Sequence, residues 1–178
     1  ISYARAGALG PDLFNFSPYP KYTSMAHYCS SGKLAKKMLE MAKKDGDRKK
    51  IAFAYGWISH VAADMKIHDW VNRVVENEKN LPSGQGEYHN GNESLHTDIE
   101  LSIDKLNIKE HPGVAFPKID IPNAFLSKAY RDVYQCDKNS PSASTIRIAE
   151  NAGSTVVTDL PTRIIFKDSK KYDTNEYR

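Results

Sequence analysis

Apolar residues recur at helical spacing in two neighbouring stretches of the chain. Within residues 24–44 they lie three and four positions apart, and lysines fill much of the other side, which predicts an amphipathic helix. The sequence Asp-Gly-Asp at residues 45–47 predicts the end of this helix. Residues 48–77 form the longest periodic segment and contain no proline, so we expect a largely buried helix of roughly 25 to 29 residues there.

Shorter helices are predicted after this segment. The apolar pattern predicts helices at residues 93–107 and 122–135, and residues 142–152 are compatible with another. Residues 78–92 are rich in glycine and asparagine and predict a loop. The predicted fold class is therefore mainly α.

Both ends of the chain carry less regular patterns. Residues 7–24 hold two glycines and three prolines among aromatic residues, which predicts an irregular, packed segment. The β-branched runs at residues 155–157 and 163–166 fit either a strand or a buried helix. Residues 167–178 are polar, and we expect a frayed tail there.

Size and composition indicate one globular domain, residues 1–178. Apolar residues make up 40% of the 178 residues and charged residues 26%, a balance typical of folded rather than disordered chains. The net charge of +3 is too low for a dedicated nucleic-acid binder, and no apolar run approaches the roughly eighteen residues that cross a bilayer. Two cysteines are too few for a disulfide scaffold or a four-thiolate zinc site.

Three residues with metal-binding side chains share the longest predicted helix. His60, Asp64 and His68 follow one another at intervals of four residues. Positions four apart differ by only about 40° around a helix, so the three side chains lie along one stripe. Polar side chains in an otherwise apolar helix need partners. A metal ion would satisfy them, and hydrogen bonds within the core are the alternative explanation.

Four further residues could complete a metal site. His96 and Glu100 are again four positions apart and could bind one metal ion together, although such pairs are also common on helix surfaces. His27 lies near the start of an earlier helix, and Asp12 lies in the segment predicted to be irregular. Together the four histidines and three carboxylates suffice for two zinc ions, and clusters of such ions are suited to holding a phosphate.

The same residues lie in four sequence blocks that resemble the zinc-dependent phospholipase C family. The blocks are residues 7–14 (GALGPDLF), 24–27 (SMAH) followed by 33–35 (KLA), 56–68 (GWISHVAADMKIH) and 96–100 (HTDIE). The wider group also contains the single-strand-specific zinc nucleases and the catalytic domain of the phospholipase D that cleaves glycosylphosphatidylinositol anchors. The resemblance implies a bundle of α-helices with a multinuclear zinc site held between them.

The resemblance also implies a role for each candidate residue. Asp12 would lie at the open side of one zinc ion, as a ligand and as the candidate general base. The other ligands of this zinc would be His27, His60 and Asp64. Asp64 resembles the carboxylate that bridges to a neighbouring metal. The protein ligands of another zinc would be His68, His96 and Glu100.

The activity implied by the resemblance is attack of a metal-activated water on a phosphodiester phosphorus, in line with the leaving group. The substrate would be a phospholipid, from which hydrolysis releases the phosphorylated headgroup. Glu100 and Ile67 favour the phospholipases, because the nucleases usually have Asp as the last ligand and commonly proline at the position of Ile67. A single-strand-specific zinc nuclease and a non-catalytic, zinc-stabilised binding domain are the alternatives.

The beginning of the sequence departs from the family pattern. The family's third metal is bound by a mature N-terminal Trp and by a His in the first helix, whereas residue 1 is Ile and no His precedes His27. We therefore expect either that the first family helix is missing or that the protein uses two zinc ions.

The resemblance to secreted bacterial lipases implies lipid degradation outside the cytoplasm. It also implies a transient contact with a membrane surface and no stable nucleic-acid partner. For the lysine-rich residues 33–50 we expect a solvated helix face, with contact to an anionic membrane surface as the alternative.

Overall fold

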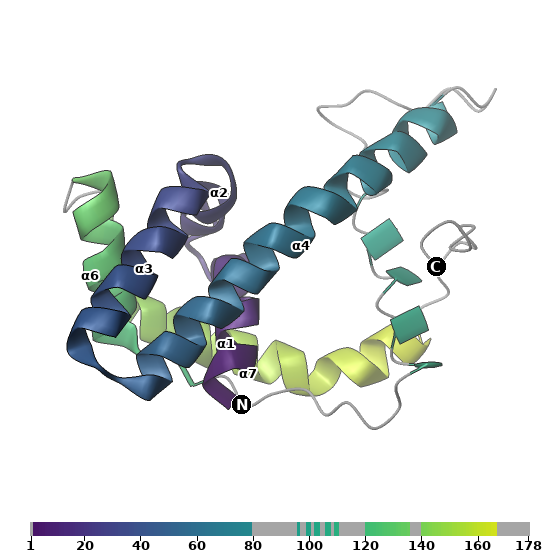
Figure 1. Ribbon diagram of the computed structural model, residues 1–178. Coiled ribbons are helices and arrows are strands. Elements are labelled where there is room, and N and C mark those ends of the chain that lie inside the picture. The colour runs from purple at the N-terminus through teal and green to yellow at the C-terminus, as the bar shows by residue number, and fades with distance from the viewer. Residues whose placement is uncertain are drawn as a thin grey trace. The chain divides into compact units, whose positions relative to one another are not determined.

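The computed structural model is mainly helical, as the sequence predicts, and the part of the chain that it describes contains no strand (Figure 1). The described residues are 2–79, 96, 99–100, 102–103, 106–107, 109–110, 120–135 and 140–166. None of the helices within these ranges is both long enough and apolar enough to span a membrane.

Four short helical segments open the chain: α1 (Ser2–Leu9), the 3₁₀ helix η1 (Gly10–Phe16), α2 (Lys21–Tyr28) and α3 (Ser31–Asp45). The irregular segment predicted for residues 7–24 is therefore wrong. Gly7 lies inside α1, and Pro11 occupies the first turn of η1, where a missing amide hydrogen costs no hydrogen bond. The single helix predicted for residues 24–44 is also wrong, because Ser30 adopts a left-handed conformation with φ of 59° between α2 and α3.

The later helices follow the sequence prediction closely. The long helix predicted for residues 48–77 is confirmed as α4 (Arg48–Lys79), which has 32 residues. The helix predicted for residues 122–135 is confirmed as α6 (Asn123–Tyr134). The last helix, α7 (Ala143–Phe166), continues through both β-branched runs, which are therefore helical rather than extended.

Three predictions fall wholly or partly outside the described residues. The frayed tail predicted for residues 167–178 lies outside them, as does the loop predicted for residues 78–92 apart from its first two residues, which belong to α4. For the helix predicted at residues 93–107, the positions that the structure describes are helical, and they include His96 and Glu100.

Contacts between residues divide the chain into two compact units. The first contains Ile1–Ala63 and Phe116–Thr158, and the second contains Asp64–Ala115 and Asp159–Arg178. The boundary falls within α4, so this helix contributes residues to both units. The organisation of residues 1–178 as one domain stays a prediction.

The core of the first unit is a cluster of aromatic and aliphatic side chains. Phe14, Phe53, Trp57 and Tyr130 are all fully buried in it. The ring of Tyr130 meets the rings of Phe14 and Trp57 edge-on, and its hydroxyl donates a hydrogen bond of 3.2 Å to the backbone carbonyl of Tyr22. These contacts hold η1, α2 and α4 against α6.

The second unit has a smaller apolar core. Trp70, Val71 and Val75 of α4 are buried against Ile99 and Ile103. Because His96 and Glu100 flank Ile99 in sequence, this packing positions the helical turn that carries both of them.

Candidate metal centre

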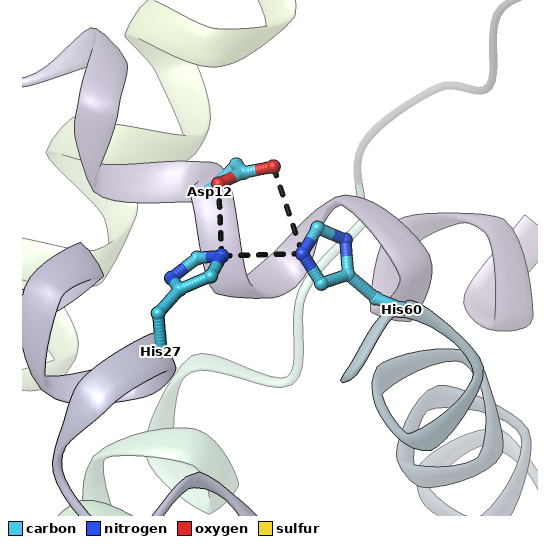
Figure 2. Close-up of side chains that lie close together, drawn as sticks. All are labelled: Asp12, His27 and His60. Carbon is cyan, nitrogen blue, oxygen red and sulfur yellow. Dashed lines mark hydrogen bonds and ion pairs between the residues drawn. The ribbon is translucent and has the colours of Figure 1, made fainter. Parts of the chain in front are cut away.

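Asp12, His27 and His60 form the first of two candidate ligand clusters. They come from η1, α2 and α4, all within the first unit, and Figure 2 shows their side chains converging. One ligand atom from each residue lies within 4.8 Å of the other two. The Nε2 atom of His27 lies 3.3 Å from Oδ1 of Asp12, and Nε2 of His60 lies 3.7 Å from Oδ2.

Backbone carbonyls fix the tautomers of both imidazoles. Nδ1 of His27 lies 2.9 Å from the carbonyl oxygen of Thr23, and Nδ1 of His60 lies 2.7 Å from that of Ala8. A carbonyl oxygen can only accept a hydrogen bond, so each Nδ1 carries the hydrogen and donates it. In the neutral rings the Nε2 atoms are then left with lone pairs. This arrangement is the usual one for histidines that bind metals through Nε2.

The converging atoms need a cation. The two Nε2 atoms lie 3.2 Å apart, and the Asp12 carboxylate faces both of them. In this tautomeric state all three groups present lone pairs to the same point, and they repel one another unless a positive charge lies among them. Two imidazole nitrogens and a carboxylate oxygen are a ligand set that zinc prefers, so these residues fit a zinc ion.

Asp12 is the most accessible member of the first cluster. Its side chain is 38% exposed, against 9% for His27 and 17% for His60. The side-chain amide of Asn15 donates a hydrogen bond of 3.3 Å to its Oδ1 atom. A substrate approaching from solvent would therefore meet the carboxylate before the imidazoles.

Two glycines allow α1 to reach His60. A Cβ atom on Gly7 would lie 2.1 Å from the carbonyl oxygen of Phe53, and one on Gly56 would lie 1.9 Å from that of Ala4. No side chain fits at either distance, so α1 and α4 cross with their backbones in direct contact. The crossing brings the carbonyl of Ala8, near the end of α1, to the imidazole of His60.

His68, His96 and Glu100 form the second cluster, which lies within the second unit. Nε2 of His96 lies 3.0 Å from Oε1 of Glu100, and Nε2 of His68 lies 3.4 Å from the same oxygen. The two imidazole rings meet edge-on with centroids 4.9 Å apart. Oδ1 of Asp64 lies 3.0 Å from Nε2 of His68, so a second carboxylate faces this imidazole.

The charges in the second cluster shift two pKa values strongly. Hydrogen bonds to Asp64 and then to Glu100 raise the pKa of His68 from 6.5 to about 10, against the opposing effect of burial. Burial raises the pKa of Glu100, but the hydrogen bonds from His68 and His96 outweigh it and lower the pKa to about 2. Without a metal, a proton on His68 therefore supplies positive charge between the carboxylates.

The structure brings the sequence-predicted residues into two groups. It gathers Asp12 with His27 and His60, and His68 with His96 and Glu100. It places Asp64 beside His68, while its predicted contact with the first zinc stays a prediction. Binding of metal by all seven residues likewise stays a prediction. Sequence reasoning missed the carbonyls of Ala8 and Thr23, because every residue has a carbonyl and no residue type reveals these two.

Comparison with known proteins agrees with this geometry. The family model for zinc-dependent phospholipase C matches residues 1–147, well beyond the last of the motif blocks. The chain belongs to the zinc-dependent phospholipase C family. No curated protein and no solved structure matches it. Membership of the family supports zinc as the metal and hydrolysis of a phosphodiester as the chemistry.

Proposed function

We propose that this protein is a zinc-dependent phospholipase C, which cleaves the bond between the glycerol oxygen and the phosphorus of a phospholipid. The observation that carries the proposal is the pair of imidazoles in the first cluster. Each has its Nδ1 atom tied to a backbone carbonyl, and the two Nε2 atoms lie 3.2 Å apart beside the Asp12 carboxylate. This arrangement is the usual one for histidines that bind a divalent cation such as zinc.

The proposed ligands follow the two clusters. His27 and His60 would bind one zinc together with Asp12 and Asp64, and Asp64 would bridge to the next metal. The other zinc would be bound by His68, His96 and Glu100. Zinc supplies a Lewis acid that polarises phosphate oxygens and lowers the pKa of water. We propose two zinc ions for the residues of this chain.

Asp12 is the proposed general base. Its carboxylate is the most exposed group of the first cluster, so it can reach a water molecule on the solvent side. The hydrogen bond from Asn15 to Oδ1 orients the carboxylate, which leaves Oδ2 to accept a proton. The water oxygen would attack phosphorus opposite the glycerol oxygen while Asp12 accepts the proton of that water. The bond between phosphorus and the glycerol oxygen would break, and that oxygen would take a proton from a solvent water and leave as the alcohol of diacylglycerol.

The preference for a lipid over a nucleic acid rests on two features of the sequence. Glu100 stands where the related nucleases usually carry Asp. The net charge of +3 also gives little electrostatic attraction for a polynucleotide. We infer that the protein acts on phospholipids outside the cytoplasm and contacts the membrane surface only transiently.

Metal analysis combined with a soluble substrate tests the proposal. We expect two zinc ions per chain by elemental mass spectrometry, and hydrolysis of a short-chain, water-soluble phosphatidylcholine that a chelator abolishes. Asp12→Asn should lower kcat by about 10²- to 10⁴-fold, the usual contribution of a general base. Asp120→Asn is the matched control, since this carboxylate lies in the first unit and outside both clusters.

Two outcomes would contradict the proposal. Cleavage of single-stranded DNA without hydrolysis of lipid would identify a nuclease instead. Zinc that raises the melting temperature without any turnover would identify a binding domain, because a metal bound only by the folded state stabilises that state.

A further inference from the structure

The first unit contains an open groove to which none of its candidate metal ligands contributes a side chain. It has a volume of about 650 Å³ and lies where α3, the start of α4 and the start of α6 meet. Figure 1 shows α3 and α6 side by side, with the beginning of α4 next to the end of α3. None of the seven candidate ligands lines the groove.

Lysines surround this groove. Lys37 and Lys44 of α3, Lys50 of α4 and Lys128 of α6 all line it, and the acidic residues lining it are Asp45 and Asp132. The surrounding sequence is basic as well. Residues 31–50 contain eight basic and three acidic residues, a net charge of +5 against +3 for the whole chain. The positive charge of this protein is thus concentrated on α3 and the first turn of α4.

Internal ion pairs leave part of this charge unneutralised. Lys37 and Lys128 both approach the single carboxylate of Asp132, each at 3.2 Å. Lys50 pairs with Asp45 at 2.6 Å and also lies 4.0 Å from the Asp47 carboxylate, so its charge is neutralised within the chain. Lys44 is exposed and has no acidic partner among the residues that the structure describes. One carboxylate for two ammonium groups, with Lys44 in addition, leaves the groove attractive to an anion.

The groove is also lined by apolar side chains. Those of Met41, Pro122 and Phe125 line it together with the lysines. The Nζ atom of Lys50 lies 5.6 Å from the centroid of the Phe125 ring, within the range of a cation–π interaction. The methylene groups of the lysine side chains add further apolar surface to the groove. A ligand that fits this groove carries negative charge next to an apolar body.

We propose that the groove between α3 and α6 is a docking site for anionic phospholipid at a membrane surface, separate from the metal centre. The lysines would bind the phosphate of the lipid, and its glycerol and upper acyl region would contact Met41 and Phe125. The proposal rests on the proposed function only in that an enzyme acting on phospholipids must meet a lipid surface. Such a site would hold the enzyme at a bilayer while successive substrates are cleaved.

Vesicle binding tests this proposal directly. The zinc-loaded full chain, carrying Asp12→Asn in every sample so that hydrolysis of lipid is slow, is sedimented with phosphatidylcholine vesicles that contain or lack phosphatidylglycerol. We expect binding only to the anionic vesicles and a steep loss of binding as salt is raised. Lys44→Glu should weaken binding by about tenfold or more, and Lys128→Gln by roughly fivefold. Arg147→Glu, an equal charge change at an exposed position of α7 outside the groove, should leave binding unchanged.

The failures of this proposal and of the proposed function are distinguishable. Equal binding to both kinds of vesicle, or equal losses from Lys44→Glu and Arg147→Glu, would overturn the docking site. So would Lys44-dependent binding of a single-stranded oligonucleotide without vesicle binding, since the groove would then serve a different partner. Hydrolysis of soluble substrate by the unaltered protein tests the proposed function separately and does not depend on the groove.

Discussion

The carbonyl oxygen of Ala8 accepts a hydrogen bond of 2.7 Å from Nδ1 of His60, a residue 52 positions later in the chain. This contact decides which nitrogen of His60 is available to a metal. It exists because α1 and α4 cross at Gly7 and Gly56 without intervening side chains. The metal-binding capacity of the first cluster therefore depends on a helix crossing that contributes no ligand.

Gly56→Ala tests this dependence. The added methyl group would lie 1.9 Å from the Ala4 carbonyl oxygen, so α1 must move away and take the Ala8 carbonyl with it. We expect the zinc affinity of the first cluster to fall by about 10- to 100-fold, as is typical when the hydrogen bond that orients a metal-binding histidine is lost. Competition with a chromophoric chelator would measure the affinity.

Gly32→Ala is the matched control for this substitution. Gly32 lies in α3 and has open space where its Cβ atom would be added. The alanine should leave the zinc affinity unchanged and should not destabilise the helix. If Gly56→Ala also leaves the affinity unchanged, the crossing does not orient His60.

The sequence predicted the ligand spacing because helix geometry is local. His60, Asp64 and His68 needed only a continuous helix to share one face, and α4 is continuous over Arg48–Lys79. His96 and Glu100 needed only one helical turn. Intervals of four residues therefore predict which side chains share a helix face, even when the tertiary fold is unknown.

The features that the sequence did not predict depend on contacts between distant segments. Gly7 resembled a turn glycine, although its role is to let two backbones touch. Ser30 lies between α2 and α3 in a left-handed conformation that serine rarely adopts, and no local pattern marked it. The groove is formed by α3, α6 and the start of α4. Because α3 and α6 are about eighty residues apart in the chain, periodicity within either helix gives no sign of it.

Removal of zinc should make the stability of the protein depend on pH through the second cluster. The pKa of His68 is raised from 6.5 to about 10, so its contribution is fully present below pH 6.5 and is lost as pH rises to about 10. The pKa of Glu100 is lowered from 4.5 to about 2, so its contribution is present above pH 4.5 and is lost as pH falls toward 2. The two contributions are both complete only between pH 4.5 and 6.5.

Urea unfolding of the zinc-free protein at pH values from 4.5 to 10 would measure this pH dependence. We expect the free energy of unfolding to decline between pH 6.5 and 10, and His68→Gln to flatten that decline. Zinc binding must displace the proton from His68, so zinc affinity should instead rise with pH in the same window. An unaltered slope in His68→Gln would show that His68 does not hold this proton.

Tyr134 stabilises the end of the helix that carries His27. Its hydroxyl lies 2.9 Å from the carbonyl oxygen of Met25 and 2.6 Å from that of Cys29, and it donates a shared hydrogen bond to them. Tyr134→Phe should therefore lower the free energy of unfolding by about 1 to 2 kcal/mol, measured by urea denaturation. Tyr55→Phe, at a side chain that is 51% exposed, should have no effect. Equal effects of the two substitutions would contradict a role for this hydrogen bond.

The proposed role of Asp64 is to bind the zinc of the first cluster and bridge to the other zinc. In His96→Ala the second cluster has lost a ligand, so a chelator titration mainly reports the zinc at the first cluster. If Asp64 binds that zinc as well, adding Asp64→Asn should weaken the remaining zinc by at least about tenfold, since an amide oxygen is a poorer ligand than a carboxylate. Asp69→Asn, an exposed carboxylate on the same helix, serves as the control. Unchanged affinity in the Asp64 variant would restrict this carboxylate to its contact with His68.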